Sequence, residues 1–163
     1  MNRDALRLAA AVDVTSRATE RLKSSIVDDR ILIARAIADP NVEQDKELLR
    51  ALDAFVQRFQ QVHEHMTHRL YPAFYRVATA GDRPPALRDL FVWLERFKFF
   101  DSGLVWVERT ELRNRLIHEY PLDAADRILD LQAAVELSSA MMAEFDRVIT
   151  HIADRNILEN GNA

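Results

Sequence analysis

The sequence predicts an all-α protein, an antiparallel helical bundle of about five helices that forms one domain over residues 1–155. Three observations favour this fold class. Only three glycines and five prolines interrupt the 163 residues, apolar residues recur at helical spacing, and no segment shows a convincing strand pattern. A chain of this length is also large enough to bury a substantial core.

The first predicted helix covers about residues 3–38 and ends at Asp39-Pro40, since proline cannot continue a helix. Its length suggests a break near Ser24-Ser25. The second helix should begin after Asn41, a suitable N-cap residue, and Pro72 should kink or split it. Its apolar stripe follows alternating steps of four and three residues. The stripe consists of Leu48, Leu52, Phe55, Phe59, Val62 and Met66.

Residues 81–85 form the clearest loop, and a third helix follows over about residues 86–97. The fourth helix should begin after Asp101 or Ser102 and end at Tyr120-Pro121, because a residue before proline is biased away from helical geometry. The fifth covers about residues 123–154 and presents a heptad seam. The seam consists of Ile128, Leu131, Val135, Ser138, Met142, Phe145, Ile149 and Ile152. Residues 156–163 are expected to form a flexible tail.

Composition limits the function classes. The absence of cysteine excludes disulfides and thiolate metal sites and is typical of a reducing, cytoplasmic location. No apolar run approaches the length of a membrane span, so no membrane association is expected. A net charge of −4 argues against a general nucleic-acid coat protein. Residues 122–160 hold eight acidic and three basic side chains, so the rest of the chain carries a net charge of +1 and can present a small cationic site.

The stretch from Arg113 to Tyr120 places a guanidinium, an imidazole and a phenol within two helical turns. The imidazole can move protons near pH 7, and a guanidinium matches phosphate geometry, so the pattern suggests phosphodiester chemistry. On an ideal helix His118 lies about 140° from Arg113, so one copy does not bring all three groups together without distortion of the last turn. This favours a dimeric site. The alternative is a helix end whose cations complement the C-terminal dipole.

Arg113 to Tyr120, read as Arg-x4-His-x-Tyr, resembles the signature of the HEPN superfamily, specifically of HepT-like toxins. Glu108 to Leu112, Pro121 and the order of the helices extend this resemblance over most of residues 20–155. The resemblance implies a metal-independent ribonuclease, without a cofactor, that acts on RNA as a homodimer with both motif copies in one cleft.

By the same resemblance, Arg113 would bind the scissile phosphate, His118 would transfer protons, and Asn114 would shape the cleft. Family members are commonly paired with a minimal nucleotidyltransferase antitoxin. That partner would transfer AMP to Tyr120 and silence the toxin.

Two other functions stay open: a non-catalytic helical adaptor that binds a nucleotidyltransferase or its nucleotide, and a purely structural bundle. His63, Glu64, His65 and His68 form a second candidate group, either a zinc site, a solvated helix face, or a source of one histidine that reaches the cleft. The aromatic stretch Phe97 to Phe100 is either core or, in part, a partner surface.

Overall fold

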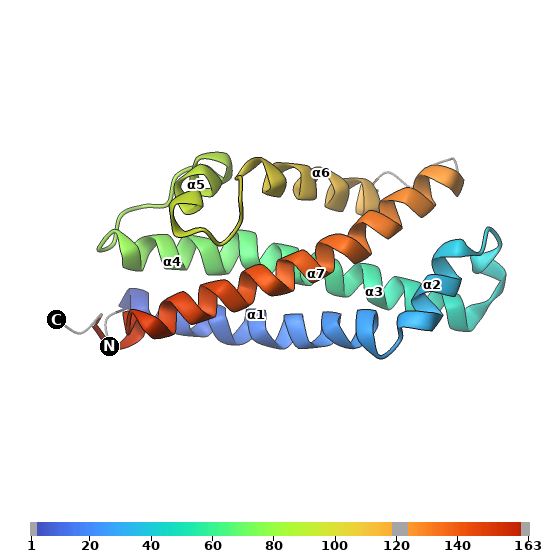
Figure 1. The fold of residues 1–163 in the computed structure, drawn as a ribbon, viewed down its shortest axis with the longest axis horizontal. Coiled ribbons are helices and arrows are strands. Elements are labelled where there is room, and N and C mark those ends of the chain that lie inside the picture. Colours follow the sequence, from blue (N-terminus) through green and yellow to red (C-terminus); the bar gives the residue numbers. More distant parts are fainter. Residues whose placement is uncertain (1–2, 119–123, 161–163) are drawn as a thin grey trace.

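The structure is a computed structural model that describes residues 3–118 and 124–160, and within those ranges it is all-helical with no strand. The predicted all-α class is confirmed. The helices run back and forth along one long axis (Figure 1). Their bounds are α1 (Arg3–Val27), α2 (Arg30–Ala38), α3 (Lys46–His65), α4 (Tyr71–Ala78), α5 (Leu87–Leu94), α6 (Leu104–His118), α7 (Ala124–Asp154) and α8 (Ile157–Asn160).

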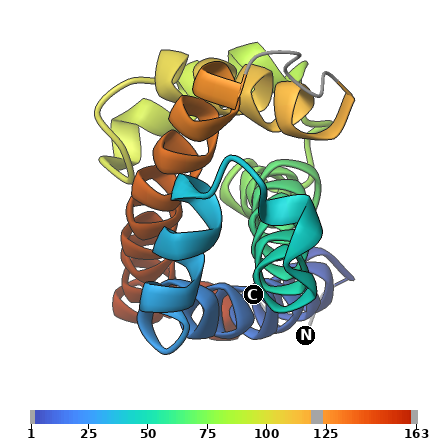
Figure 2. The same cartoon turned by 90° about the vertical axis from the view of Figure 1, so that its right-hand side faces the viewer.

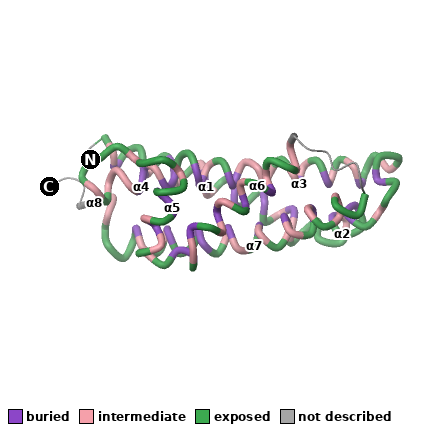
Figure 3. The backbone as a smooth tube through the Cα atoms, turned by 90° about the horizontal axis from the view of Figure 1, so that it is seen from above, coloured by how far each residue is buried: buried purple, intermediate pink, exposed green. Residues whose placement is uncertain are grey.

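Seen along this axis, α1 forms the base, α7 and the α3–α4 run flank it on opposite sides, and α5 and α6 lie across the top (Figure 2). Buried positions recur along each long helix while the connections are mainly exposed (Figure 3). Among the described residues, no helix is both long enough and apolar enough to cross a membrane.

The first predicted helix is divided, as expected from its length, but the break lies at Asp28 and Asp29 rather than at Ser24-Ser25. The backbone carbonyl of Ser24 accepts hydrogen bonds from the amides of both aspartates, which closes the end of α1. Ser25 is buried, and its hydroxyl accepts a hydrogen bond of 2.7 Å from Arg58 of α3. The long-range contact at Ser25 therefore keeps this serine within α1.

The predicted start of the second helix is wrong by one short turn. Asn41 precedes a 3-10 turn, Val42–Gln44, and its side chain makes no capping bond. Asp45 caps α3 instead, because its carboxylate accepts hydrogen bonds from the amides of Glu47 and Leu48 at 3.0 and 3.1 Å. The apolar stripe predicted for this helix is confirmed, since all six of its residues are buried.

Pro72 splits the predicted second helix, as expected. A π-helical turn, η2 (Met66–Leu70), separates α3 from α4, and Pro72 lies in the first turn of α4. Proline lacks the amide that would continue the α-helical ladder, and a π turn is a known way to absorb the resulting mismatch. The change of register leaves His68 and Arg69 exposed while Leu70 and Tyr71 on either side of the junction are buried.

The aromatic stretch after α5 packs mainly as core. A 3-10 turn, η3 (Glu95–Phe97), is followed by Lys98 in the left-handed conformation, with φ of 58°. This reversal lets Phe97 and Phe99 stack with ring centroids 5.5 Å apart, and Phe99 is buried. The next connection requires Gly103, because a Cβ there would lie 2.9 Å from the backbone of Phe91. α6 therefore begins in close contact with α5.

The predicted seam of α7 is right at four positions and wrong at four. Leu131, Ser138, Phe145 and Ile152 are buried, whereas Ile128, Val135, Met142 and Ile149 are only half-buried. The places of the last three in the core are taken by Ala134, Met141 and Val148. Either set keeps a spacing of three and four residues, so only packing against the other helices decides which face turns inward.

The end of the chain also differs from the expected tail. Residues Ile157–Asn160 form the short helix α8, which contacts α1 and α7. Ile157 and Leu158 are half-buried and pack against the core. These two apolar side chains thus anchor the segment on the bundle, although the residues around them in the sequence are mainly polar.

Candidate functional site

The motif helix α6 begins at a serine cap and ends at the motif histidine. The Ser102 hydroxyl accepts a hydrogen bond from the Leu104 amide at 3.3 Å, which confirms one of the two predicted caps. The helix ends at His118, within two residues of the predicted end. The side chain of His118 and all of Tyr120 lie outside the described residues. The convergence of these two groups with Arg113 therefore stays a prediction.

Arg113 and Asn114 lie in the last two turns of α6. Arg113 is half-buried and Asn114 is exposed, and the Arg113 guanidinium donates a hydrogen bond of 3.1 Å to the Asn114 side-chain oxygen. In the part of the chain that the structure describes, no carboxylate pairs with Arg113, and its Nε is buried without a hydrogen-bond partner. Asn114 holds this guanidinium in place, and the terminal guanidinium nitrogens, rather than the buried Nε, are the donors that face an incoming anion.

His63 is the histidine that reaches the motif helix from α3. It is buried, and its Nε2 lies 3.2 Å from the Thr110 hydroxyl of α6. That hydroxyl donates its only proton to the Trp106 carbonyl at 2.8 Å, so His63 must donate from Nε2 to Thr110. Burial and then Arg113 lower the pKa of His63 to about 4. His63 is thus a neutral donor at neutral pH, in electrostatic contact with Arg113.

The other histidines of this group do not form a metal centre with it. Within residues 3–118 and 124–160 no group of three or more histidine, aspartate or glutamate side chains could hold a metal ion. His68 is exposed, and His65 is half-buried with a pKa lowered by burial and by Arg69. The zinc alternative therefore has no support in the described residues.

A buried ion pair lies one helical turn before Arg113, and the sequence did not single it out. Arg109 donates two hydrogen bonds to Glu144 of α7, at 2.6 and 2.8 Å, and both side chains are only 4% exposed. The Arg109 guanidinium also lies over the Trp106 ring, 4.8 Å from its centroid. Glu144 sits beside the buried seam of α7, and this position next to Phe145 was the only signal in the sequence.

A second ion pair, between Arg115 and Asp130, lies next to Arg113. Arg115 donates to both carboxylate oxygens of Asp130 in α7, at distances from 2.9 to 3.3 Å. Together the pairs Arg109–Glu144 and Arg115–Asp130 fasten α6 to α7 on either side of Arg113. Two of the three arginines in this part of α6 are thus neutralised, and Arg113 is the one that has no carboxylate partner among the described residues.

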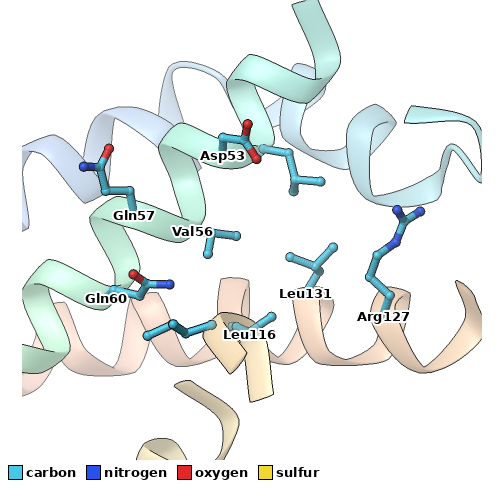
Figure 4. A pocket seen from close by; sticks show the side chains of 9 residues that line it. Asp53, Val56, Gln57, Gln60, Leu116, Arg127 and Leu131 are labelled. Carbon is cyan, nitrogen blue, oxygen red and sulfur yellow. The ribbon is translucent and has the colours of Figure 1, made fainter. Parts of the chain in front are cut away.

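A hollow of about 260 Å³ lies beside the last turns of α6, between α3 and α7 (Figure 4). Val56, Leu116 and Leu131 face into it, while Asp53, Gln57, Gln60 and Arg127 provide polar groups around them. Arg127 is tied to the backbone carbonyl of Asp39 by a hydrogen bond of 3.3 Å. An apolar floor with amide and carboxylate groups at its edge can hold a flat, partly polar ring.

No protein-family model, curated protein or solved structure matches the chain.

Proposed function

We propose that the chain is a HEPN-type ribonuclease toxin whose metal-independent site is built from two copies of the Arg113–His118 motif. The observation that carries this proposal is the contrast along α6. Arg109 and Arg115 are committed to carboxylates, whereas Arg113 has none among the described residues and lies in the turns that lead to His118. A guanidinium left without an internal anion at the surface suits a phosphate ligand.

The proposed reaction uses only groups of the protein and of RNA. A histidine of the motif takes the proton of a 2′-hydroxyl, and the 2′-oxygen forms a bond to the adjacent phosphorus. The bond from phosphorus to the 5′-oxygen breaks, and this leaving oxygen receives a proton from the second motif copy. Arg113 stabilises the charge that builds on the phosphate oxygens. The products are a 2′,3′-cyclic phosphate and a 5′-hydroxyl.

The surface of α6 supports the proposed homodimer. The helix has no single apolar face: its inner side carries the buried pair residue Arg109, while Leu104 on its outer side is 58% exposed. An exposed apolar residue on the outer side of α6 fits a helix that packs against a second copy of itself.

The hollow beside the last turns of α6 supports a substrate with a base. In the proposed site it would hold a nucleobase next to the scissile phosphate, with Gln57 and Gln60 near the edge of the ring. The toxin would act on cytoplasmic RNA. A minimal nucleotidyltransferase partner would silence it by adding AMP to Tyr120, which places a phosphate close to Arg113.

Growth arrest and RNA cleavage test the proposal together. Arg113→Ala should reduce cleavage by about 10²–10³-fold, and His118→Ala by about 10²–10⁴-fold. Arg50→Ala removes an exposed arginine of α3 and serves as the matched control, which should stay fully toxic. Activity should survive chelators, and the product should carry a cyclic phosphate end. Full toxicity of either motif variant at equal expression would refute the catalytic assignment.

The non-catalytic adaptor is the second outcome of this experiment. It would give no RNA cleavage by the wild-type protein, yet a stable complex with a minimal nucleotidyltransferase. Intact mass after co-expression tests the regulatory step: we expect one or more added AMP masses that map to Tyr120 and are absent in Tyr120→Phe. Modification elsewhere, or neutralisation of Tyr120→Phe, would leave simple occlusion by a bound antitoxin.

A further inference from the structure

A second cavity, of about 440 Å³, lies between α1 and the junction of η2 with α4, apart from the hollow beside α6. Its rim is basic, with Arg7 from α1 and His68, Arg69 and Arg76 from the η2–α4 run. Its floor is formed by small or apolar side chains. These are Ala10, Ala11, Val14, Pro72 and Ala73. We refer to this cavity as the basic groove.

The basic groove is positively charged although the chain as a whole is negatively charged. Among the described residues three arginines and no acidic residue line it, whereas the whole protein carries a net charge of −4. Arg69 and Arg76 pair with no carboxylate in the described residues. Arg7 pairs with Asp4 at 3.3 Å, but its side chain is 46% exposed, and such surface pairs are weak. The three guanidinium groups are thus available to an anion.

The local backbone explains how these cations come to share one cavity. The π turn before Pro72 exposes His68 and Arg69 together, and Arg76 follows seven residues after Arg69 on the same run. Helical rise separates the backbones of these two arginines by about 10 Å, so their guanidinium groups can contact successive phosphates. The alanines of the floor leave room for a ligand backbone between the rims. The spacing therefore fits two or more phosphates in succession.

The basic groove is joined to the motif helix through the α3–η2 run. His68 belongs to its rim, and His68 and Arg113 both lower the pKa of His63, after the larger effect of burial. His63 itself contacts α6 through Thr110. The groove and the motif helix are thus linked through one continuous run of backbone, since His68 at the rim follows five residues after His63, which contacts α6.

We propose that the basic groove binds the phosphodiester backbone of single-stranded RNA at a distance from the cleavage motif. The proposal rests on the proposed ribonuclease function, because it names the substrate form that this function would hold. In residues 3–118 and 124–160 no aromatic side chain lines the groove for stacking, so its contacts should be made to phosphates and should not depend on base sequence.

The test is binding of a fluorescent single-stranded RNA with 2′-fluoro sugars, which lacks the attacking hydroxyl and is not cleaved. Fluorescence anisotropy would compare the wild type with Arg69→Gln/Arg76→Gln. We expect about tenfold weaker binding and a salt dependence whose log–log slope falls by about 1.4, or about 0.7 for each lost contact. Arg21→Gln/Arg50→Gln removes two exposed arginines outside the groove and should bind as the wild type does.

Equal weakening by both double variants, or unchanged binding by the groove variant, would overturn the proposal. Displacement of the RNA by AMP at the same phosphate concentration would also overturn it, because the groove would then be a mononucleotide site. Circular dichroism of each variant checks that the helices are intact.

A cleavage assay separates this proposal from the proposed function. A dinucleotide carries a single phosphodiester bond, which the motif itself would occupy, so the groove variant should cleave it at the wild-type rate while its KM for a long RNA rises. If RNA binding depends on the groove but no RNA is cleaved, the proposed ribonuclease function is refuted and the proposed RNA-binding groove stands. If cleavage of long RNA depends on Arg113 but the groove variant has an unchanged KM, the RNA-binding groove is refuted and the ribonuclease function stands.

Discussion

Arg109 and Arg113 are one turn apart on the same face of α6, yet their surroundings differ completely. Arg109 is buried between a tryptophan ring and a carboxylate that accepts two of its hydrogen bonds. Arg113 is half-buried, and the hydrogen bond it makes in the described residues goes to the neutral side chain of Asn114. The same residue type therefore fastens the bundle at one position and stays available to a ligand at the next.

The difference teaches what determines the role of an arginine in a helical bundle. α7 crosses α6 close to Arg109 and supplies Glu144, and it supplies Asp130 to Arg115, but among the described residues it offers no carboxylate to Arg113. A charge that is buried must be paired, because its desolvation is otherwise unfavourable. A charge near the surface can stay unpaired at little cost in stability, and it is then free to act.

The largest expected effect concerns the buried pair. Glu144→Ala should lower the free energy of unfolding by about 3–5 kcal/mol, because it leaves the Arg109 guanidinium buried without an anion. Urea denaturation at neutral pH measures this loss.

Arg109→Met/Glu144→Leu removes both charges and serves as the control, with a stability close to that of the wild type. If Glu144→Ala lowered the free energy of unfolding by less than about 1 kcal/mol, the ion pair of Arg109 would contribute little to stability, and Arg109 and Arg113 would differ less than their surroundings indicate.

The next effect is a pH dependence that arises from His63. Its pKa is lowered to about 4, below the ordinary 6.5, so the unfolded chain takes up the proton first as the pH falls. Stability should therefore decrease between pH 6.5 and about 4, by about 3 kcal/mol in all, and be unaffected by this group above pH 6.5.

His63→Gln, whose amide can still donate to Thr110, should remove most of that slope in denaturation curves recorded across this range. An unchanged slope in His63→Gln would assign the pH dependence to other groups. His151, whose pKa is lowered by burial and by Arg155, is the next candidate.

A smaller effect is expected at the exposed pair. Arg115 and Asp130 have side chains that are 44% and 16% exposed, so solvent screens their attraction. A double-mutant cycle with Arg115→Ala and Asp130→Ala should give a coupling energy of about 0.2–1 kcal/mol that decreases with added salt. A coupling as large as that of the buried pair would contradict the view that burial sets the energetic scale along α6.

The smallest effect on stability is expected at Arg113 itself. Arg113→Ala removes no ion pair among the described residues, so the free energy of unfolding should change by about 0.5 kcal/mol or less. The same variant should lose cleavage, which separates stability from function at this position. A destabilisation of several kcal/mol would instead make Arg113 a structural residue and would weaken the proposed function.

The sequence by itself determined the fold class and most of the helix ends. The stripe from Leu48 to Met66 is buried as its spacing predicts, Pro72 divides its helix, and residues 81–85 form a connection between α4 and α5. These features depend on residues that are close in the sequence. Proline restricts the backbone conformation next to it, and the 3.6-residue period of a helix sets which nearby residues share a face. The motif was likewise visible in one short segment.

Only the tertiary structure decided how charges and faces are used. The seam of α7 turned to Ala134, Met141 and Val148, because both possible seams had helical spacing and packing alone chose between them. The pairing of Arg109 with Glu144 joins residues 35 positions apart, which no local pattern specifies. The basic groove likewise combines Arg7 with Arg69 and Arg76 from a distant helix. Charges act through space, so their partners are fixed only when the helices have packed.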